Sequence, residues 1–247
     1  MRTILVTGGA KRLGAAIVRR LAAGAHRVVI HHGRSADAAA ALAQEVGAVG
    51  TVAGDLADLS SIGALWKRAC TVAGGPIYGL VNSASQFDFD RPEAVDRDLA
   101  ARLQAVNCTA PVLLAGRLAG QGITGVVINL LDQKLANPNP DFFSYTLTKA
   151  ALAQATVLMA QAFAPRVRVN AVSPGLTLPS GDQSAAQFAE VARANLLARP
   201  VGADAVADAV AYLIDAESVT GQNLFVDCGQ RFVKRDGDVM FEGRADA

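Results

Sequence analysis

Cysteine is scarce in this sequence, which has three in 247 residues: Cys70, Cys108 and Cys228. Their number is odd and their wide spacing matches no zinc-binding pattern, so the sequence offers neither a disulfide framework nor a metal site. We expect all three to be reduced thiols in or near the core, and we expect no bound metal.

Long apolar runs are missing as well. Hydrophobic residues make up 51% of the chain and the mean hydropathy is +0.28, but much of this is alanine in helical patterns. No stretch approaches the ~18–20 apolar residues that a membrane-spanning helix needs. The first apolar run follows Met1 and Arg2 without a signal-peptide pattern. These absences favour a cytoplasmic protein that does not bind a membrane.

An excess of charge of one sign is also absent. The 23 basic and 22 acidic residues give a net charge of +1, which gives no reason to expect a nucleic acid as a partner. The length suits one α/β domain, which we assign to residues 1–247. Within it, residues 180–200 interrupt the regular pattern and are expected to form a substrate loop and helix. Residues 230–247 form a polar C-terminal tail.

Strand-like and helix-like patterns alternate along the chain. Short apolar runs predict strands at Thr3–Thr7, Arg27–His31, Ala48–Ala53, Gly79–Asn82, Gly125–Leu130, Val167–Val172 and Asn223–Val226. Helical patterns lie near Gly14–Ala23, Ala36–Val46, Leu59–Val72, Asp96–Gly116, Phe143–Ala162 and Ala203–Asp215. This alternation predicts an α/β fold: a single doubly wound parallel sheet (Rossmann fold) of about seven strands with helices on both faces. A ligand would bind at the carboxyl ends of the strands.

Two short motifs carry chemical information. A glycine turn, Thr7–Gly14, follows the apolar run Ile4–Val6 and precedes a helical pattern, which lets backbone amides approach a pyrophosphate. Further on, Tyr145 and Lys149 are four residues apart, so a helix places them on one face. An ammonium group close to a phenol stabilises the phenolate. We therefore expect Lys149 to lower the pKa of Tyr145 toward neutrality, where tyrosine can donate and accept protons.

Together these motifs resemble the short-chain dehydrogenase/reductase family, from Arg2 to about Arg231. The family pattern runs TGxxxGxG, NNAG, Asn, Ser, YxxxK and PG. It is present here as Thr7–Gly14, Asn82–Ser85, Asn107, Asp132, Tyr145 with Lys149, and Pro174–Gly175. Two positions depart from it, because Arg12 replaces the middle glycine and Asp132 replaces the catalytic serine. With the segment His31–Ser35, these departures resemble the pteridine reductase branch, which includes reductases of dihydrobiopterin, dihydromonapterin and dihydrofolate.

The resemblance implies a role for each matching residue. Tyr145 would act as acid and base, Lys149 would hold the nicotinamide ribose, and Asn107 would kink its helix and seat a proton-relay water. The implied catalytic residues are Tyr145, Lys149, Asp132 and Asn107. The implied cofactor-binding residues are Gly8, Lys11, Arg12, Leu13, Gly14, His31, Arg34, Ser35, Asp55, Leu56, Asn82, Ser83, Ala84, Lys149, Pro174, Gly175 and Thr177. The implied substrate-binding residues are Phe87, Asp132, Tyr145 and Leu176.

Charge at the end of the second strand favours NADP(H) over NAD(H). NAD sites usually carry a carboxylate there for the ribose 2′-hydroxyl, whereas the segment His31–Ser35 contains none. Arg34, with Lys11 and Arg12 from the glycine turn, would pair with a 2′-phosphate. The alternative is that these are ordinary solvated charges. Asp55 is expected either to contact the adenine or to cap a helix.

Asp132 shapes the expected chemistry. A serine at this position would donate a hydrogen bond to a carbonyl oxygen that becomes negative as hydride arrives, whereas an ionised aspartate would repel that oxygen. A ring C=N bond instead needs a proton on its nitrogen, which a carboxyl group can pass on or help a tyrosine or water to deliver. Phe87 is expected to stack on a flat pterin ring, unless it is a core residue or Phe89 takes this role.

The sequence therefore predicts an NADPH-dependent reductase of a pterin or folate-like substrate. The alternatives are a short-chain reductase of another carbonyl or imine compound, a family member that has lost its chemistry, and a non-catalytic NADP(H)-binding protein. The family resemblance implies a homotetramer formed through the helical segments Asp96–Gly116 and Phe143–Ala162. It also implies that the tail brings Lys234 or Arg235 to the active site of a neighbouring subunit, the alternative being a solvated tail.

Overall fold

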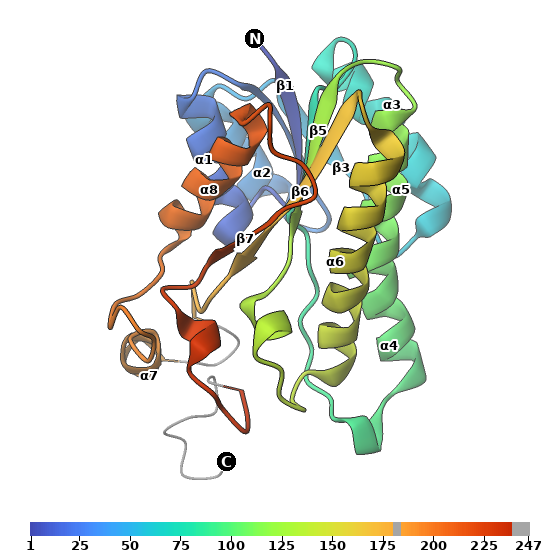
Figure 1. Cartoon of the computed structure of the whole chain (residues 1–247). Coiled ribbons are helices and arrows are strands. Elements are labelled where there is room, and N and C mark those ends of the chain that lie inside the picture. The colour runs from blue at the N-terminus through green and yellow to red at the C-terminus, as the bar shows by residue number, and fades with distance from the viewer. Residues whose placement is uncertain (180–183, 239–247) are drawn as a thin grey trace.

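The chain folds around one seven-stranded sheet in the order β3-β2-β1-β4-β5-β6-β7 (Figure 1). The structure, a computed structural model, describes residues 1–179 and 184–238. The strands are β1 (Thr3–Thr7), β2 (Arg27–His32), β3 (Gly50–Ala53), β4 (Gly79–Asn82), β5 (Gly125–Leu130), β6 (Val167–Pro174) and β7 (Asn223–Val226). Every neighbouring pair is parallel, so the predicted doubly wound α/β fold is confirmed.

Helices cover both faces of the sheet (Figure 1). One face carries α1 (Arg12–Ala23), α2 (Ala36–Val46) and α8 (Ala203–Asp215), and the other carries α3 (Ile62–Ala73), α4 (Arg97–Gln104), α5 (Ala110–Ala119) and α6 (Phe143–Phe163). The short helix α7 (Ala185–Val191) begins with a capping box at Ser184. Within residues 1–179 and 184–238, no helix is long and apolar enough to cross a membrane.

The helix predicted over Asp96–Gly116 is interrupted in the middle. Asp96 caps α4 by accepting a hydrogen bond from the amide of Leu99, but the residues Ala105–Thr109 form a π-helical turn before α5 begins. Pro111 lies in the first turn of α5, lacks an amide hydrogen, and would clash with the carbonyl four residues earlier in a regular helix. The wider turn accommodates it, and Asn107 lies at the centre of that turn.

Two apolar cores lie on either side of the sheet because side chains of each strand alternate between its faces. Ile4 and Val6 of β1 pack with residues of α1 and α8, whereas Leu5 packs with residues of α3 and α5. All residues of β1, β4 and β5 are buried. Burial on both faces explains why these strands are continuous apolar runs in the sequence rather than alternating patterns.

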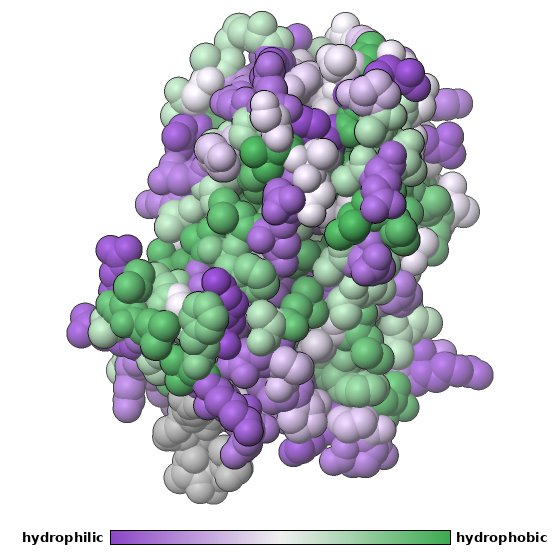
Figure 2. All heavy atoms as spheres, in the orientation of Figure 1, coloured by the Kyte–Doolittle hydropathy of each residue, from purple (hydrophilic) through white to green (hydrophobic). Residues whose placement is uncertain are grey.

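Exposed apolar side chains follow α6, which lies at the front of the view in Figure 2. Leu147 and Leu158 of this helix are 54% and 55% exposed. Val157 of α6 and Leu113 of α5 are also exposed. These side chains lie on the two helical segments from which the sequence predicts assembly.

The carboxyl ends of the strands meet at the lower edge of the sheet in Figure 1. The strand order reverses direction between β1 and β4, and ligands of such sheets bind beside that point. The end of the described chain returns to the same edge, where residues 233–238 lie along the loop that follows β5. The fold therefore brings segments from both ends of the sequence to one crevice.

Candidate active site

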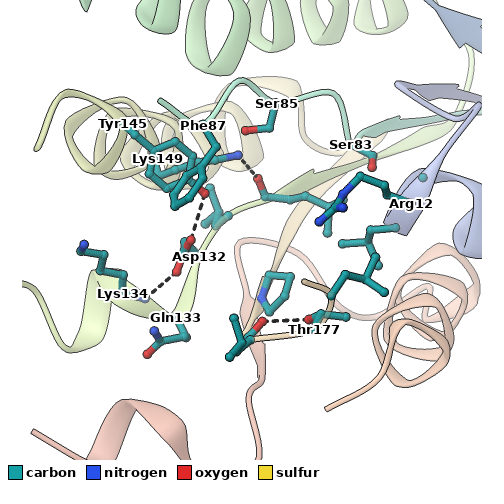
Figure 3. Close-up of a pocket in the computed structure, with 18 of the residues that line it drawn as sticks. Arg12, Ser83, Ser85, Phe87, Asp132, Gln133, Lys134, Tyr145, Lys149 and Thr177 are labelled. Carbon is teal, nitrogen blue, oxygen red and sulfur yellow. Dashed lines mark hydrogen bonds between the residues drawn. The ribbon is translucent and has the colours of Figure 1, made fainter. Parts of the chain in front are cut away.

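A cavity of about 650 Å³ opens at this edge of the sheet (Figure 3). Its walls come from the glycine turn, the segments after β4, β5 and β6, helix α6 and the C-terminal segment. They are formed by Gly8, Lys11, Arg12, Leu13, Gly14, Ser83, Ala84, Ser85, Phe87, Leu130, Leu131, Asp132, Gln133, Lys134, Tyr145, Lys149, Pro174, Gly175, Leu176, Thr177, Leu178, Gln230 and Asp238. Most of the residues predicted from the sequence are therefore neighbours.

The glycine turn packs directly against the segment after β4. Gly8 has a φ of +60°, and a Cβ there would lie 2.8 Å from Cα of Ala84. A Cβ on Gly14 would lie 2.1 Å from the carbonyl oxygen of Gly8, so a side chain is excluded at both positions. In the described chain no side chain caps α1 at Lys11, which leaves the first amides of this helix open to an anion.

A second cavity of about 430 Å³ lies beyond the glycine turn, at the ends of β2 and β3. It is lined by Gly8, His31, Gly33, Arg34, Gly54, Asp55, Leu56, Ala84, Ser85, Gln86, Arg102 and Val106. Arg34 and Arg102 reach it from different elements, a loop and α4. Sequence reasoning missed Arg102, because nothing in the pattern of α4 indicates that this helix ends beside β2.

His31 lines the second cavity, but both nitrogens of its ring are engaged within the protein. Its ring is 2% exposed, Nδ1 accepts a hydrogen bond from the amide of Gly8 at 3.2 Å, and Nε2 lies 3.2 Å from the carbonyl oxygen of Gly54. Burial lowers the pKa of His31 to about 4, so the ring is neutral at physiological pH. A neutral ring with both nitrogens engaged cannot pair with a phosphate. His31 instead ties the glycine turn to the end of β3.

The other predicted phosphate contacts are divided between the two cavities. Arg12 lines the first cavity and donates to the carbonyl oxygen of Pro179 at 2.6 Å, whereas Arg34 lines the second. Ser35 stands at the N-terminus of α2 and lines neither cavity. Asp55 lines the second cavity and accepts a hydrogen bond from the amide of Ala57, but it caps no helix in the described chain, because Asp58 caps the following turn, Leu59–Ser61.

Two asparagines support the site from beneath. Asn82 is buried, lines neither cavity and donates to Oδ1 of Asn129 at 2.8 Å, which fastens β4 to β5. Asn107 accepts a hydrogen bond from the amide of Gln86 at 2.8 Å. It donates to the Gln86 carbonyl oxygen at 2.9 Å and to Oγ1 of Thr148 at 3.2 Å. Asn107 thus joins the loop after β4 to α6.

Tyr145, Lys149 and Asp132 meet on the cavity wall (Figure 3). The Tyr145 hydroxyl donates to Oδ2 of Asp132 at 2.9 Å, and Oδ1 of Asp132 accepts from the amide of Lys134 at 2.8 Å. Lys149 Nζ donates to the carbonyl oxygen of Leu130 at 2.8 Å and lies 5.5 Å from the centre of the Tyr145 ring. The helical spacing does place Tyr145 and Lys149 on one face, as predicted.

The direction of the Tyr145 pKa shift is opposite to the expected one. Burial raises the pKa of Tyr145 well above 10, and the neighbouring charge of Asp132 raises it further. Burial also lowers the pKa of Lys149 to about 8 and raises the pKa of Asp132. The expectation was wrong because the tyrosine hydroxyl is buried and, in addition, faces a carboxyl group rather than the ammonium group. Tyr145 therefore keeps its proton at neutral pH.

Phe87 faces the cavity, and Phe89 does not line it. Phe87 is 40% exposed, so it is not a core residue. Its ring stacks on Phe142 with a centroid distance of 4.0 Å and meets Tyr145 edge-on at 4.7 Å. A flat aromatic surface therefore stands next to the tyrosine hydroxyl, where a planar substrate would reach both.

The segment after β6 closes the opposite wall. A Cβ on Gly175 would lie 2.7 Å from Oε1 of Gln230, and the same oxygen accepts from the amide of Leu176 at 2.7 Å. The Thr177 hydroxyl donates to the carbonyl oxygen of Gly175 at 2.8 Å. Of the predicted substrate loop, residues 180–183 lie outside the described residues, and residues 184–200 line neither cavity.

Two charged residues of the first cavity were not predicted. Lys134, two residues after Asp132, is 3% exposed, and Asp238 reaches the cavity from the C-terminal segment. The prediction that Lys234 or Arg235 reaches the active site of a neighbouring subunit concerns a second chain and stays a prediction. Within the described residues of this chain, Arg235 donates to the carbonyl oxygen of Ala194, Lys234 lines neither cavity, and the tail brings an acid, Asp238, to the first cavity. Lys134 could have been suspected from its place after β5, whereas Asp238 carries no sequence signal.

Comparisons with known proteins agree with this geometry. A family model described as enoyl-(acyl carrier protein) reductase matches residues 8–231. L-xylulose reductase of Bos taurus is 33% identical over 243 residues, which cover 92% of this chain and 96% of that protein. Pteridine reductase 1 of Leishmania tarentolae is 31% identical over 274 residues, which cover 91% of this chain and 94% of that protein. The protein in the crystal structure of FolM alternative dihydrofolate reductase 1 from Brucella suis in complex with NADP is 40% identical to this chain. The two structures match with a TM-score of 0.90, and the match covers 95% of this chain and 96% of that chain.

The chain belongs to the short-chain dehydrogenase/reductase family. It is an oxidoreductase with a nicotinamide dinucleotide cofactor, as the sequence predicts. Its relatives include reductases named for sugars and for pterins, so membership of the family leaves the substrate to be argued from the site.

Proposed function

We propose that this protein uses NADPH to reduce a C=N bond of a pterin or folate-like substrate, within a single domain formed by the whole chain. The hydrogen bond between Tyr145 and Asp132, next to the exposed ring of Phe87, carries the proposal. It is supported by the similarity to FolM alternative dihydrofolate reductase 1 and to pteridine reductase 1.

The cofactor is NADP(H), and the described residues fit it. Close packing at Gly8 and Gly14 brings backbone, not side chains, to the start of α1, where a pyrophosphate would face the helix amides. Arg34 and Arg102 line the second cavity and suit a 2′-phosphate, because the planar guanidinium donates two parallel hydrogen bonds. Lys149, Pro174 and Thr177 would hold the nicotinamide end. The bound cofactor supplies the hydride.

Side chains of the protein deliver the proton that the ring nitrogen of the substrate needs. Because the pKa of Tyr145 is raised, its hydroxyl remains a donor at neutral pH and orients the Asp132 carboxyl group. The raised pKa of Asp132 lets this carboxyl group take up a proton and release it to a ring nitrogen, directly or through the tyrosine. A ketone is a poor partner for this arrangement, because its developing oxyanion would meet a carboxylate.

The shape of the cavity favours a flat substrate. The ring of Phe87 is braced from behind by Phe142, so it presents a fixed face. Offset stacking of a pterin on that face would contribute about 0.5–1.5 kcal/mol beyond the burial of area. Leu176, which also lines the cavity, would cover the ring from the side of β6.

A second candidate is the reduction of a carbonyl compound, as the identity to L-xylulose reductase suggests. One observation favours it: Ser85 lines the cavity, its hydroxyl donates to Oδ1 of Asn107 at 3.2 Å, and its side chain acts to lower the pKa of Tyr145, so a neutral hydroxyl is present beside the acid. A protein that only binds NADP(H) would not need the buried tyrosine and carboxylate pair.

The direct test is NADPH oxidation with dihydrobiopterin, dihydromonapterin and dihydrofolate beside a panel of ketones and sugars. We expect turnover of at least one pterin or folate compound and little turnover of the ketones. Turnover confined to carbonyl compounds would refute the proposal, and binding of NADPH without any turnover would support the non-catalytic alternative.

We also propose that the protein is a cytoplasmic homotetramer assembled through α5 and α6. The exposed Leu113, Leu147, Val157 and Leu158 are the side chains that assembly would bury. Light scattering after size-exclusion chromatography measures the mass, and Leu158→Lys should reduce it. A monomeric mass for the unaltered protein would contradict the assembly.

A further inference from the structure

Lys134 is a charged side chain buried inside the active-site wall. It is 3% exposed, and its Nζ donates to the carbonyl oxygen of Asp141 at 2.6 Å. Within residues 1–179 and 184–238, the carboxylate within ion-pair distance of Nζ is that of Asp238, at 3.1 Å. A buried ammonium group is costly unless it is paired and hydrogen-bonded, so the position of Lys134 depends on Asp238.

The segment that carries Asp238 is fixed along the loop after β5. Asn137 donates to the carbonyl oxygen of Val233 at 2.7 Å, and Asn139 donates to that of Gly237 at 3.0 Å. The amide of Asp238 donates to Oδ2 of Asp141 at 2.8 Å. These three contacts, together with the ion pair, join two stretches of chain that are about a hundred residues apart.

Lys134 is connected to both halves of the catalytic pair. Its backbone amide holds Oδ1 of Asp132, the carboxyl group that accepts from Tyr145 (Figure 3). Its ammonium group holds the carbonyl oxygen of Asp141, directly before Phe142 and the start of α6, which carries Tyr145. Asp132 and Tyr145 come from different elements, and Lys134 spans the two.

We propose that Asp238 is a positioning residue of its own subunit's active site, which holds Lys134 in place and thereby aligns Asp132 with Tyr145. The inference deepens the proposed function, and it rests on that function only for the choice of substrate. It predicts that the C-terminal segment acts in cis and that its contribution is the negative charge of Asp238. The remainder of the segment supplies the backbone contacts that deliver this charge.

The test compares three variants with the unaltered protein. Asp238→Asn keeps the shape of the side chain but leaves the ammonium group of Lys134 without its counter-charge. Asp236→Asn removes the same charge from an exposed residue of the same segment and serves as the matched control. The double variant Lys134→Met with Asp238→Asn removes both charges, which in buried pairs is commonly tolerated.

We expect Asp238→Asn to lower kcat by about 10–100-fold, as small misplacements of catalytic groups do, with little change in NADPH affinity. The double variant should not recover this loss, because methionine cannot hold the carbonyl oxygen of Asp141, and Asp236→Asn should behave as the unaltered protein. A merely structural role would give recovery, because removing both charges relieves the unpaired buried ammonium group. Equal kcat values for Asp238→Asn and Asp236→Asn, or full recovery in the double variant, would overturn the inference.

The assay uses whichever compound of the panel the unaltered protein reduces, so the two proposals fail separately. Absence of pterin and folate turnover refutes the proposed function, while the comparison of variants still tests Asp238 with another substrate.

Hydrogen exchange supplies a readout that needs no substrate. Amides of residues 132–142 should exchange faster in Asp238→Asn than in Asp236→Asn, and equal exchange would count against the inference.

Discussion

The hydroxyl group of Tyr145 donates a hydrogen bond to the carboxyl group of Asp132 across 2.9 Å on the cavity wall, where Tyr145 is buried and Asp132 is half-buried. The two residues are thirteen positions apart and lie on different elements, the loop after β5 and helix α6. Burial raises the pKa of both groups, so at neutral pH Tyr145 is a phenol that keeps its proton beside a carboxyl group, rather than a phenolate beside a cation.

Removal of the tyrosine hydroxyl should abolish most turnover. Tyr145→Phe keeps the ring against Phe87 but takes the proton donor away, so kcat should fall about 10²-fold or more with little change in NADPH affinity. Steady-state kinetics and a fluorescence titration with NADPH check this. Tyr212→Phe, on the exposed surface of α8, is the control. A Tyr145→Phe variant that retains full activity would assign the proton to another group.

Replacement of the carboxylate should change the substrate preference. Asp132→Ser introduces a neutral donor that can stabilise a developing oxyanion, so the ratio of kcat/KM for ketones to that for dihydropterins should rise. The measurement is the same substrate panel with both proteins. If the ratio stays constant, Asp132 does not select between C=N and C=O substrates.

Cofactor preference should depend on the guanidinium groups of the second cavity. Arg34→Ala should weaken NADPH binding by about 1.5–3 kcal/mol, roughly tenfold or more, because a charge-assisted contact to the 2′-phosphate is lost. The affinity for NADH should stay nearly the same. Arg97→Ala, which removes a fully solvated arginine from the start of α4, should change neither affinity. Equal affinities for NADPH and NADH in the unaltered protein would contradict the charge argument.

The exposed phenylalanine should contribute to substrate binding rather than to stability. Phe87→Ala should raise KM for a dihydropterin about 3–10-fold, from the loss of about 0.5–1.5 kcal/mol of stacking, with a small change in Tm. Phe89→Ala provides the comparison, because that ring packs edge-on against Phe142 and does not line the cavity. A large fall in Tm with an unchanged KM would make Phe87 a packing residue.

The pH dependence should reflect Lys149. Burial lowers its pKa to about 8, so the ammonium group that would hold the cofactor is present below this pH and is lost above it. The value of kcat/KM for NADPH should therefore fall as the pH rises through about 8, while Tyr145 keeps its proton because its pKa is well above 10. Lys149→Arg stays charged and should move the fall to higher pH. A flat profile up to pH 10 would show that the ionisation of Lys149 does not limit the reaction.

Local patterns in the sequence were sufficient for the fold and for part of the site. The positions of strands and helices along the chain follow from apolar periodicity, and a parallel sheet places the carboxyl ends of its strands along one edge. The glycine turn and the spacing of Tyr145 and Lys149 are also local, so both could be located in advance. The interruption at Asn107 was expected from family resemblance, and Pro111 gives it a physical cause.

The tertiary structure decided the burial and the charged neighbours of each titratable side chain in the site. Sequence spacing placed Lys149 near Tyr145, but only the fold shows that the hydroxyl is buried and faces Asp132. Burial first, and then this contact, reverse the direction of the pKa shift. In the same way, His31 was placed at the correct strand end, yet burial and two hydrogen bonds make it a neutral support. A pKa depends on burial and on all neighbouring charges, and neither is a property of local sequence.

The sequence by itself determined the parallel sheet, the crevice at its edge, and the residues of the glycine turn, α6 and the strand ends that line it. Those features depend on local periodicity and on backbone geometry that a few residues specify. Only the tertiary structure decided that Lys134 is buried and that Asp238, 104 residues later, supplies its counter-charge. Such a pairing arises because folding brings distant segments together, and the side chain that completes a buried ion pair is chosen by position in space.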